Sequence, residues 1–170
     1  ECVAAGVRRI ESMVRENDFV MWPDCNYAPW DPEVSLYATH FLFAAKAAGY
    51  AVPDTTVAWA VRFLQRLADD ADPAIAVYAC HTLALAGEGD RDRMLTLYDR
   101  RGELSLLSRS RLARAFAKSG DRKRAETLLA NAESPGSVRE AAFALLALVE
   151  LDRDDPRLLT LVEYIQSHSE

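Results

Sequence analysis

The chain has 170 residues, of which 50% are hydrophobic and 27% charged, and its formal net charge at pH 7 is −6. A chain of this size suits a single soluble domain, expected over residues 1–170, that buries about 70% of its unfolded surface without a metal or a disulfide. The acidic balance argues against nucleic acid or an anionic membrane as partner, since both reward clustered lysine and arginine.

No apolar run reaches the ~18 residues of a membrane span, so no direct membrane insertion is expected. The first residue is Glu1 rather than methionine. We therefore expect the domain to be a fragment of a larger multi-domain protein.

Nine helices are predicted from apolar periodicity and from helix start and stop signals, and no alternating strand pattern occurs. The fold class is therefore all-α. The helices are expected at about 1–15, 31–49, 54–69, 72–87, 90–101, 104–119, 121–134 and 138–151, and from 155 onwards. Aspartates are the expected N-caps, three of them followed by a proline suited to the first helical position. These caps are Asp31, Asp54, Asp72, Asp121 and Asp155.

The expected helices alternate between two kinds. The stretches 54–69 and 121–134 are apolar on one face and polar on the other, which is typical of a helix with one solvent-exposed face. By contrast, 31–49 and 72–87 are apolar nearly all round, so we expect both to be covered on every side. This alternation predicts antiparallel helical hairpins in two layers, with covered helices inside and half-exposed helices outside.

A short repeat supports this architecture. The hexad 37–42, Tyr-Ala-Thr-His-Phe-Leu, recurs 41 positions later as 78–83, Tyr-Ala-Cys-His-Thr-Leu. The triplet Gly-Asp-Arg at 89–91 returns 31 positions later at 120–122. Repeated hairpins bury their apolar faces against their neighbours. They either stack into an open solenoid or form an α/α toroid, partial or closed, and periodicity leaves both open.

Seven arginines gather in one part of the chain, and acidic residues interrupt them. That interspersion is typical of a solvated face, so we expect these side chains to face water. They are Arg91, Arg93, Arg100, Arg101, Arg109, Arg111 and Arg114.

His40 and His81 occupy equivalent places in the two hexads. Paired imidazoles can serve as metal ligands or acid–base groups, but no third ligand is evident, so we expect both to be hydrogen-bonded within the packed inner layer. Three cysteines, Cys2, Cys25 and Cys80, form no zinc-ligand or CxxC pattern and are expected to be free thiols. We predict no metal and no cofactor.

The segment 17–33 mixes aromatic and acidic residues. One interpretation is a carbohydrate-enzyme site that uses two of Asp24, Asp31 and Glu33 as paired carboxylates. The favoured interpretation is structural, with 21–23 (Met-Trp-Pro) and Trp30 plugging the end of the inner layer. The serines in 105–110 have no activating histidine nearby in sequence. We therefore predict no catalytic residue and no enzyme activity.

The stretch 19–53 resembles a known family. It carries an aromatic Trp22-Pro23 turn, Trp30, the first hexad and the run Ala-Gly-Tyr-Ala-Val-Pro at 48–53. In these features it is similar to the thioester-type α/α domain of bacterial alpha-2-macroglobulins. Later segments near 78–87 and 137–145 look similar as well.

The resemblance implies a non-catalytic helical domain of a large, broad-spectrum protease-trapping inhibitor. Such a protein is periplasmic, cell-envelope associated or secreted, and the domain's partners are the other domains of the same chain, with proteases as targets of the whole. Thioester-bearing members carry a Cys-x-Glu-Gln motif, which this chain lacks at both Cys2 and Cys25. Either the motif lies upstream of Glu1 or the protein traps by shape alone.

Two other functions stay open. A tetratricopeptide-like scaffold for protein or peptide binding fits the helical hairpins, although spacings of 41 and 31 straddle its 34-residue period. An α/α-toroid carbohydrate enzyme is the remaining alternative.

Overall fold

The computed structural model describes residues 2–15, 19 and 31–168. Within them the chain forms nine α-helices, one short 3-10 helix and no strand beyond an isolated bridge between Val14 and Phe19. The all-α prediction is confirmed. The helices are α1 (Cys2–Met13), α2 (Pro32–Ala47), α3 (Asp54–Leu67), α4 (Pro73–Ala86), α5 (Arg91–Asp99), η1 (Arg101–Glu103), α6 (Leu106–Lys118), α7 (Arg122–Leu128), α8 (Val138–Leu151) and α9 (Arg157–His168).

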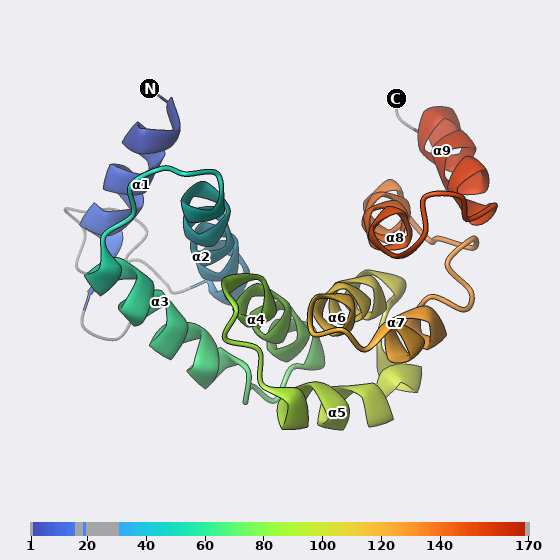
Figure 1. Cartoon of the computed structure of the whole chain (residues 1–170), viewed down its shortest axis with the longest axis horizontal. Coiled ribbons are helices and arrows are strands. Elements are labelled where there is room, and N and C mark those ends of the chain that lie inside the picture. Colours follow the sequence, from blue (N-terminus) through green and yellow to red (C-terminus); the bar gives the residue numbers. More distant parts are fainter. Residues whose placement is uncertain (1, 16–18, 20–30, 169–170) are drawn as a thin grey trace.

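The helices form an arc of two layers (Figure 1). In the inner row α2 packs on α4, α4 on α6, and α6 on α8. The outer helices α3, α5 and α7 lie along the convex side, each against inner helices, and α9 packs on α8. The two ends of the chain lie at the two tips of the arc. The described residues therefore form part of a toroid, with the two predicted layers confirmed.

Helix α4 is the central element of the core. All nine residues from Ala76 to Ala84 are buried, as expected for a helix that is apolar on every side. The same expectation is wrong for α2, because Val34 is 54% exposed and Tyr37 is 71% exposed. The difference follows from position, since α4 lies between two inner neighbours whereas α2 packs on only one.

Aspartate and serine caps begin the inner helices. The Asp31 carboxylate accepts hydrogen bonds from the backbone N–H groups of Glu33 (2.9 Å) and Val34 (3.2 Å), and Asp72 caps α4 in the same way. The predicted cap at Asp54 is wrong. The N-cap of α3 is Pro53, and Asp54 is the first helical residue, where its negative charge still favours the helix dipole.

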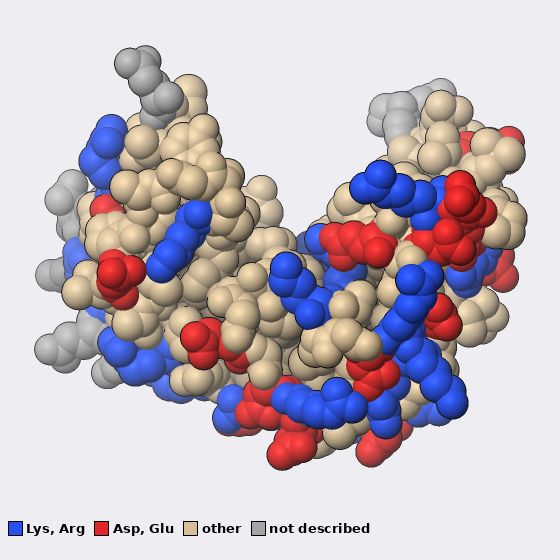
Figure 2. All heavy atoms as spheres, viewed as in Figure 1, with Lys and Arg blue, Asp and Glu red and all other residues tan. Residues whose placement is uncertain are grey.

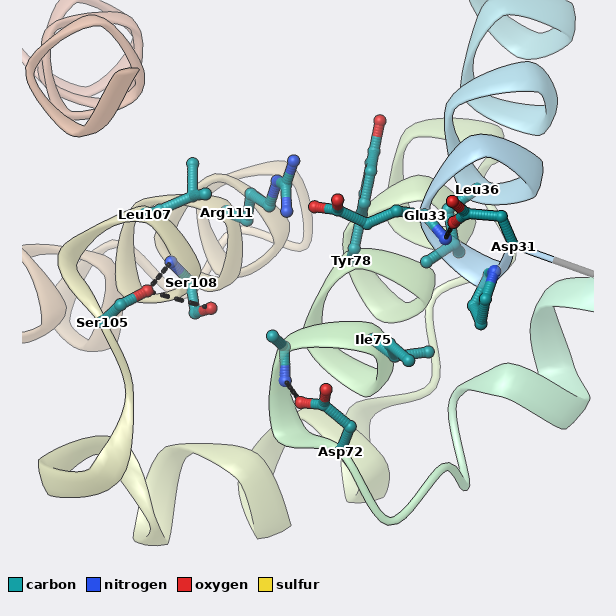
Figure 3. Close-up of a pocket in the computed structure, with 12 residues that line it drawn as sticks. Asp31, Glu33, Leu36, Asp72, Ile75, Tyr78, Ser105, Leu107, Ser108 and Arg111 are labelled. Carbon is teal, nitrogen blue, oxygen red and sulfur yellow. Dashed lines mark hydrogen bonds between the residues drawn. The ribbon is translucent and has the colours of Figure 1, made fainter. Parts of the chain in front are cut away.

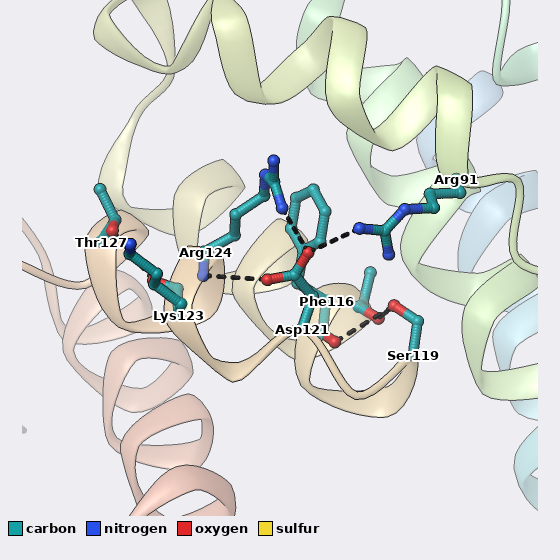
Figure 4. Close-up of polar contacts among 8 residues, drawn as sticks. Arg91, Phe116, Ser119, Asp121, Lys123, Arg124 and Thr127 are labelled. Carbon is teal, nitrogen blue, oxygen red and sulfur yellow. Dashed lines mark hydrogen bonds and ion pairs between the residues drawn. The ribbon is translucent and has the colours of Figure 1, made fainter.

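Asp121 joins three helices (Figure 4). Its carboxylate accepts from the backbone N–H of Arg124, which caps α7 as predicted, and pairs with the guanidinium groups of Arg124 and of Arg91 on α5. The preceding Gly120 has φ +82°, a left-handed conformation that closes α6 and turns the chain. This cluster fixes α7 and α5 together over α6.

Helix α7 is shorter than predicted and ends at Leu128. Beyond it the backbone continues in tighter turns, with Leu129 N–H bonded to the Glu126 carbonyl at 3.1 Å. The apolar face nevertheless persists, because Leu129 and Ala132 are both fully buried. Apolar spacing therefore predicted the packing correctly and the helix length incorrectly.

Most of the aromatic segment 17–30 lies outside the described residues, including the proposed plug at 21–23 and Trp30. Phe19 is described, and its ring packs edge-on against Trp59 (4.6 Å between centroids) and Phe63 (5.6 Å). Both partners belong to the outer helix α3. Among the described residues no helix is long and apolar enough to span a membrane.

Candidate functional site

A pocket of about 370 Å³ lies on the concave side of the arc, where all four inner helices meet. Figure 2 shows the hollow between the two arms. Because each inner helix contributes side chains, the pocket depends on the whole arc. Its lining residues are Glu33, Val34, Tyr37, His40, Tyr78, Arg111, Arg139 and Phe143.

Arg111 on α6 is the most unusual residue of this pocket. Its guanidinium carbon lies 3.7 Å from the centroid of the Tyr78 ring and 5.0 Å from that of Phe143. The residue is only 3% exposed, and its Nε has no hydrogen-bond partner among the described residues. Burial is the main cause that lowers its pKa. The prediction that the arginines face water is therefore wrong for Arg111, and Arg109 and Arg114 on the same helix are only partly exposed.

The same prediction holds along the convex edge. Arg91, Arg100 and Arg101 are exposed there, and Figure 2 shows positive and negative side chains interspersed over α5. Arg111 differs because it lies on the face of the inner helix α6 that packs on α4, where its guanidinium contacts the Tyr78 ring. The sequence signal that distinguishes it is the apolar environment of α6, where Leu112, Ala113 and Ala115 follow it.

The two hexad histidines lie together beside Arg111. The His40 Nδ1 lies 3.3 Å from the Tyr78 hydroxyl, and the rings of His40 and His81 meet edge to face at 5.5 Å. Burial is the main cause that lowers the pKa of both, and the nearby positive charges of Arg114 and Arg111 add to it. The pKa of His81 lies well below its usual value, so His81 is neutral at pH 7.

The hydrogen-bonding expectation is met by one histidine only. His40 has its bond to Tyr78, whereas neither ring nitrogen of the fully buried His81 has a partner among the described residues. No group of three or more His, Cys, Asp or Glu side chains positioned to hold a metal occurs in the part of the chain that the structure describes. The expectation of no metal remains a prediction.

Ion pairs surround the pocket. Arg139 of α8 reaches Glu33 of α2 at 3.3 Å, which links the two outermost inner helices across the hollow. Arg114 makes two hydrogen bonds to Glu150, at 3.0 and 2.6 Å. Both arginines that flank Arg111 therefore have a carboxylate partner.

A second pocket, of about 270 Å³, lies at the N-terminal ends of α2, α4 and α6 (Figure 3). It shares Glu33, Tyr78 and Arg111 with the first pocket, and the caps Asp31 and Asp72 also line it. It brings together the three inner-helix N-termini because alternate helices of a hairpin array run in the same direction.

This second pocket tests part of the carbohydrate-enzyme hypothesis. The Asp31 carboxylate is occupied as the cap of α2, and Glu33 is paired with Arg139. Asp24 lies outside the described residues.

The cysteines and serines show no activated nucleophile in the described part of the chain. Cys80 is buried, and desolvation raises the pKa of its thiol to about 12, while Cys2 is exposed. Cys25 lies outside the described residues. Ser105 and Ser108 bond to each other at the start of α6, where Ser105 is the N-cap.

The arc of inner and outer helices defines the chain as an α/α-toroid-like helical domain. No family model and no curated protein matches its sequence significantly. The fold itself has counterparts among solved structures of bacterial alpha-2-macroglobulins.

Native alpha-2-macroglobulin from Escherichia coli, in a structure spanning domain MG7 to the C-terminus, matches at a TM-score of 0.82 and 22% identity over 96% of this chain and 30% of that chain. Trypsin-activated alpha-2-macroglobulin from the same organism matches at 0.82 and 23% identity, over 95% of this chain and 13% of that one. Salmonella alpha-2-macroglobulin reacted with methylamine matches at a TM-score of 0.78 and 23% identity, over 93% of this chain and 12% of that chain.

The chain therefore has the fold of a helical segment of bacterial alpha-2-macroglobulins, which confirms the fold expected from the stretch 19–53. It spans between 12% and 30% of the length of the solved chains it matches. At this level of identity the likeness establishes the architecture, and function is inferred separately.

Proposed function

We propose that this chain is a non-catalytic helical domain of a bacterial alpha-2-macroglobulin-like protein that traps proteases of broad specificity. The observation that carries the proposal is the match over 93–96% of the chain, at TM-scores of 0.77–0.82, to five such structures. The motifs in 19–53 resemble the same family at the level of sequence.

The domain's role in this proposal is mechanical. A protease cuts a bait region elsewhere in the large protein, the molecule rearranges, and the rigid helical arc moves as one body. Its direct partners are the other domains of the same chain, and its expected location is extracytoplasmic, as in bacterial alpha-2-macroglobulins. The chain carries no Cys-x-Glu-Gln motif, so any covalent capture would use residues outside 1–170.

The test uses the full-length protein that the gene encodes, incubated with trypsin. A trap leaves trypsin active on a small chromogenic peptide but protects a large protein substrate from it, because the confined enzyme is reached only by small molecules. The 170-residue chain alone serves as control and should change neither activity. Full-length protein that leaves hydrolysis of the large substrate unaffected would contradict the proposal.

A second experiment addresses the absence of catalysis in the 170-residue chain. Incubation with methylamine and with a panel of proteases should leave the intact mass of the chain without a methylamine adduct and should produce no covalent complex. Reproducible turnover or a stable adduct would refute the non-catalytic assignment.

A further inference from the structure

We propose that the concave pocket binds an acidic side chain of a polypeptide segment, with Arg111 receiving the carboxylate and an adjacent apolar side chain packing on Val34, Tyr37 and Phe143. The site goes beyond the protease-trapping role and does not depend on it.

Arg111 is the buried cation at the centre of the proposed site. Its guanidinium carbon lies over the rings of Tyr78 and Phe143, and the residue is 3% exposed. Among the described residues it forms no ion pair within 4 Å, although the negative charge of Glu33 acts on it from farther away. A buried cation that has no carboxylate in direct contact is costly, and a bidentate carboxylate is the partner that best matches the planar guanidinium. The Tyr78 ring covers one face of the Arg111 guanidinium. The N–H edge of the guanidinium is therefore left to bind the carboxylate.

The charges favour this pocket over its neighbour. The concave pocket contains two arginines, Arg111 and Arg139, and one acid, Glu33. The pocket at the helix N-termini contains Arg111 with three acids, which repel an anion. An incoming carboxylate is therefore attracted from the hollow side.

The pocket wall explains why the ligand is a polypeptide segment rather than a phosphate or a simple anion. Val34 and Tyr37 are 54% and 71% exposed, and Phe143 borders the same space. Exposed apolar side chains next to a buried cation suit a ligand that presents a hydrophobic side chain beside its carboxylate. Tyr37 is the hexad equivalent of Tyr78, yet only Tyr78 is buried, which leaves Tyr37 free to contact a partner.

The test uses the 170-residue chain labelled with ¹⁵N at arginine, so that the Arg111 Nε–H signal is observed by NMR. The probe is a blocked pentapeptide, Gly-Phe-Glu-Leu-Gly, and its matched control has Gln in place of Glu. We expect the Glu peptide to bind and to shift the Arg111 Nε–H signal, and the Gln peptide to bind at least about tenfold more weakly. Binding of the Glu peptide should weaken as salt is raised.

Variants separate the site from general charge effects. Arg111→Met should weaken binding about tenfold without lowering the midpoint of urea unfolding, since methionine replaces a buried unpartnered charge. Arg111→Lys keeps the charge but loses the planar guanidinium, so its affinity for the Glu peptide should lie between those of the wild type and of Arg111→Met. Arg62→Met removes one arginine from the exposed face of α3 and should leave affinity unchanged. Glu33→Gln removes the pocket's acid and should tighten binding.

Three results would overturn the proposal. Equal affinity for the Glu and Gln peptides, or wild-type affinity in Arg111→Met, would show that Arg111 does not receive the carboxylate. Binding of 3-phenylpropionate as tight as that of the peptide would show that the site takes a small acid rather than a chain segment. None of these results bears on the trypsin assay, so the two proposals fail separately.

Discussion

Burial of His81 makes the stability of this domain depend on pH, and replacing His81 should remove that contribution. Its side chain is fully buried, and its pKa in the folded chain lies well below the value of 6.5 expected when unfolded, mainly because of desolvation. Above pH 6.5 the imidazole is neutral in both states. Below it the unfolded chain binds a proton that the folded chain does not, so the free energy of unfolding falls as pH falls.

The magnitude follows from proton linkage. A single proton bound only in the unfolded state lowers the free energy of unfolding by about 1.4 kcal/mol for each pH unit below 6.5, until the folded-state pKa is reached. His40 acts in the same direction. The perturbation is His81→Leu, which removes the titrating group and two buried nitrogens without partners. At pH 7.5 this variant should be at least as stable as the wild type.

The assay is urea unfolding followed by circular dichroism at pH 7.5 and pH 5.5. The loss of stability between the two pH values should be smaller in His81→Leu than in the wild type by about 1.4 kcal/mol. Thr82→Val is the matched control, because it removes the neighbouring buried hydroxyl bonded to the Tyr78 carbonyl (2.9 Å) without removing a titrating group. The reasoning is refuted if His81→Leu and the wild type lose the same stability between pH 7.5 and 5.5.

Three further predictions concern the core, a cap and a thiol. Phe116→Ala, at a fully buried side chain packed edge-on to Tyr98, should cost about 3–5 kcal/mol in urea unfolding; a loss below ~1 kcal/mol would contradict the packing of α6. Ser105→Ala should cost about 1 kcal/mol in the same assay, since Ser105 caps α6, and Ser105→Asp should restore it. In the native chain a thiol reagent should modify the exposed Cys2 rapidly and Cys80 only on unfolding, as read by peptide mass spectrometry. Rapid native labelling of Cys80 would contradict its burial.

Sequence patterns predicted the architecture well because helix ends and apolar faces are local. Asp31, Asp72 and Asp121 cap helices where expected, and α4 is buried from Ala76 to Ala84. The prediction for Asp54 is wrong because the proline precedes this aspartate instead of following it, as it does at Asp31 and Asp72, and the chain uses Pro53 as the N-cap.

The candidate site was less predictable because it depends on which inner helices are neighbours. The two hexads place Tyr37 and Tyr78 equivalently, yet their burial differs because α4 has inner helices on both sides. Arg111 was grouped with solvated arginines by its charge, although its place on α6 decides its burial. The contact between Glu33 and Arg139 spans more than a hundred residues, and no local pattern reveals it.

Hydrogen exchange of the native chain tests the two-layer arc most directly. If α4 is sheltered by α2, α3 and α6, its central amides should exchange most slowly and only through global unfolding. The outer helices α3 and α7 should exchange faster through local opening. Slower exchange in α3 or α7 than in α4 would contradict the division into inner and outer helices.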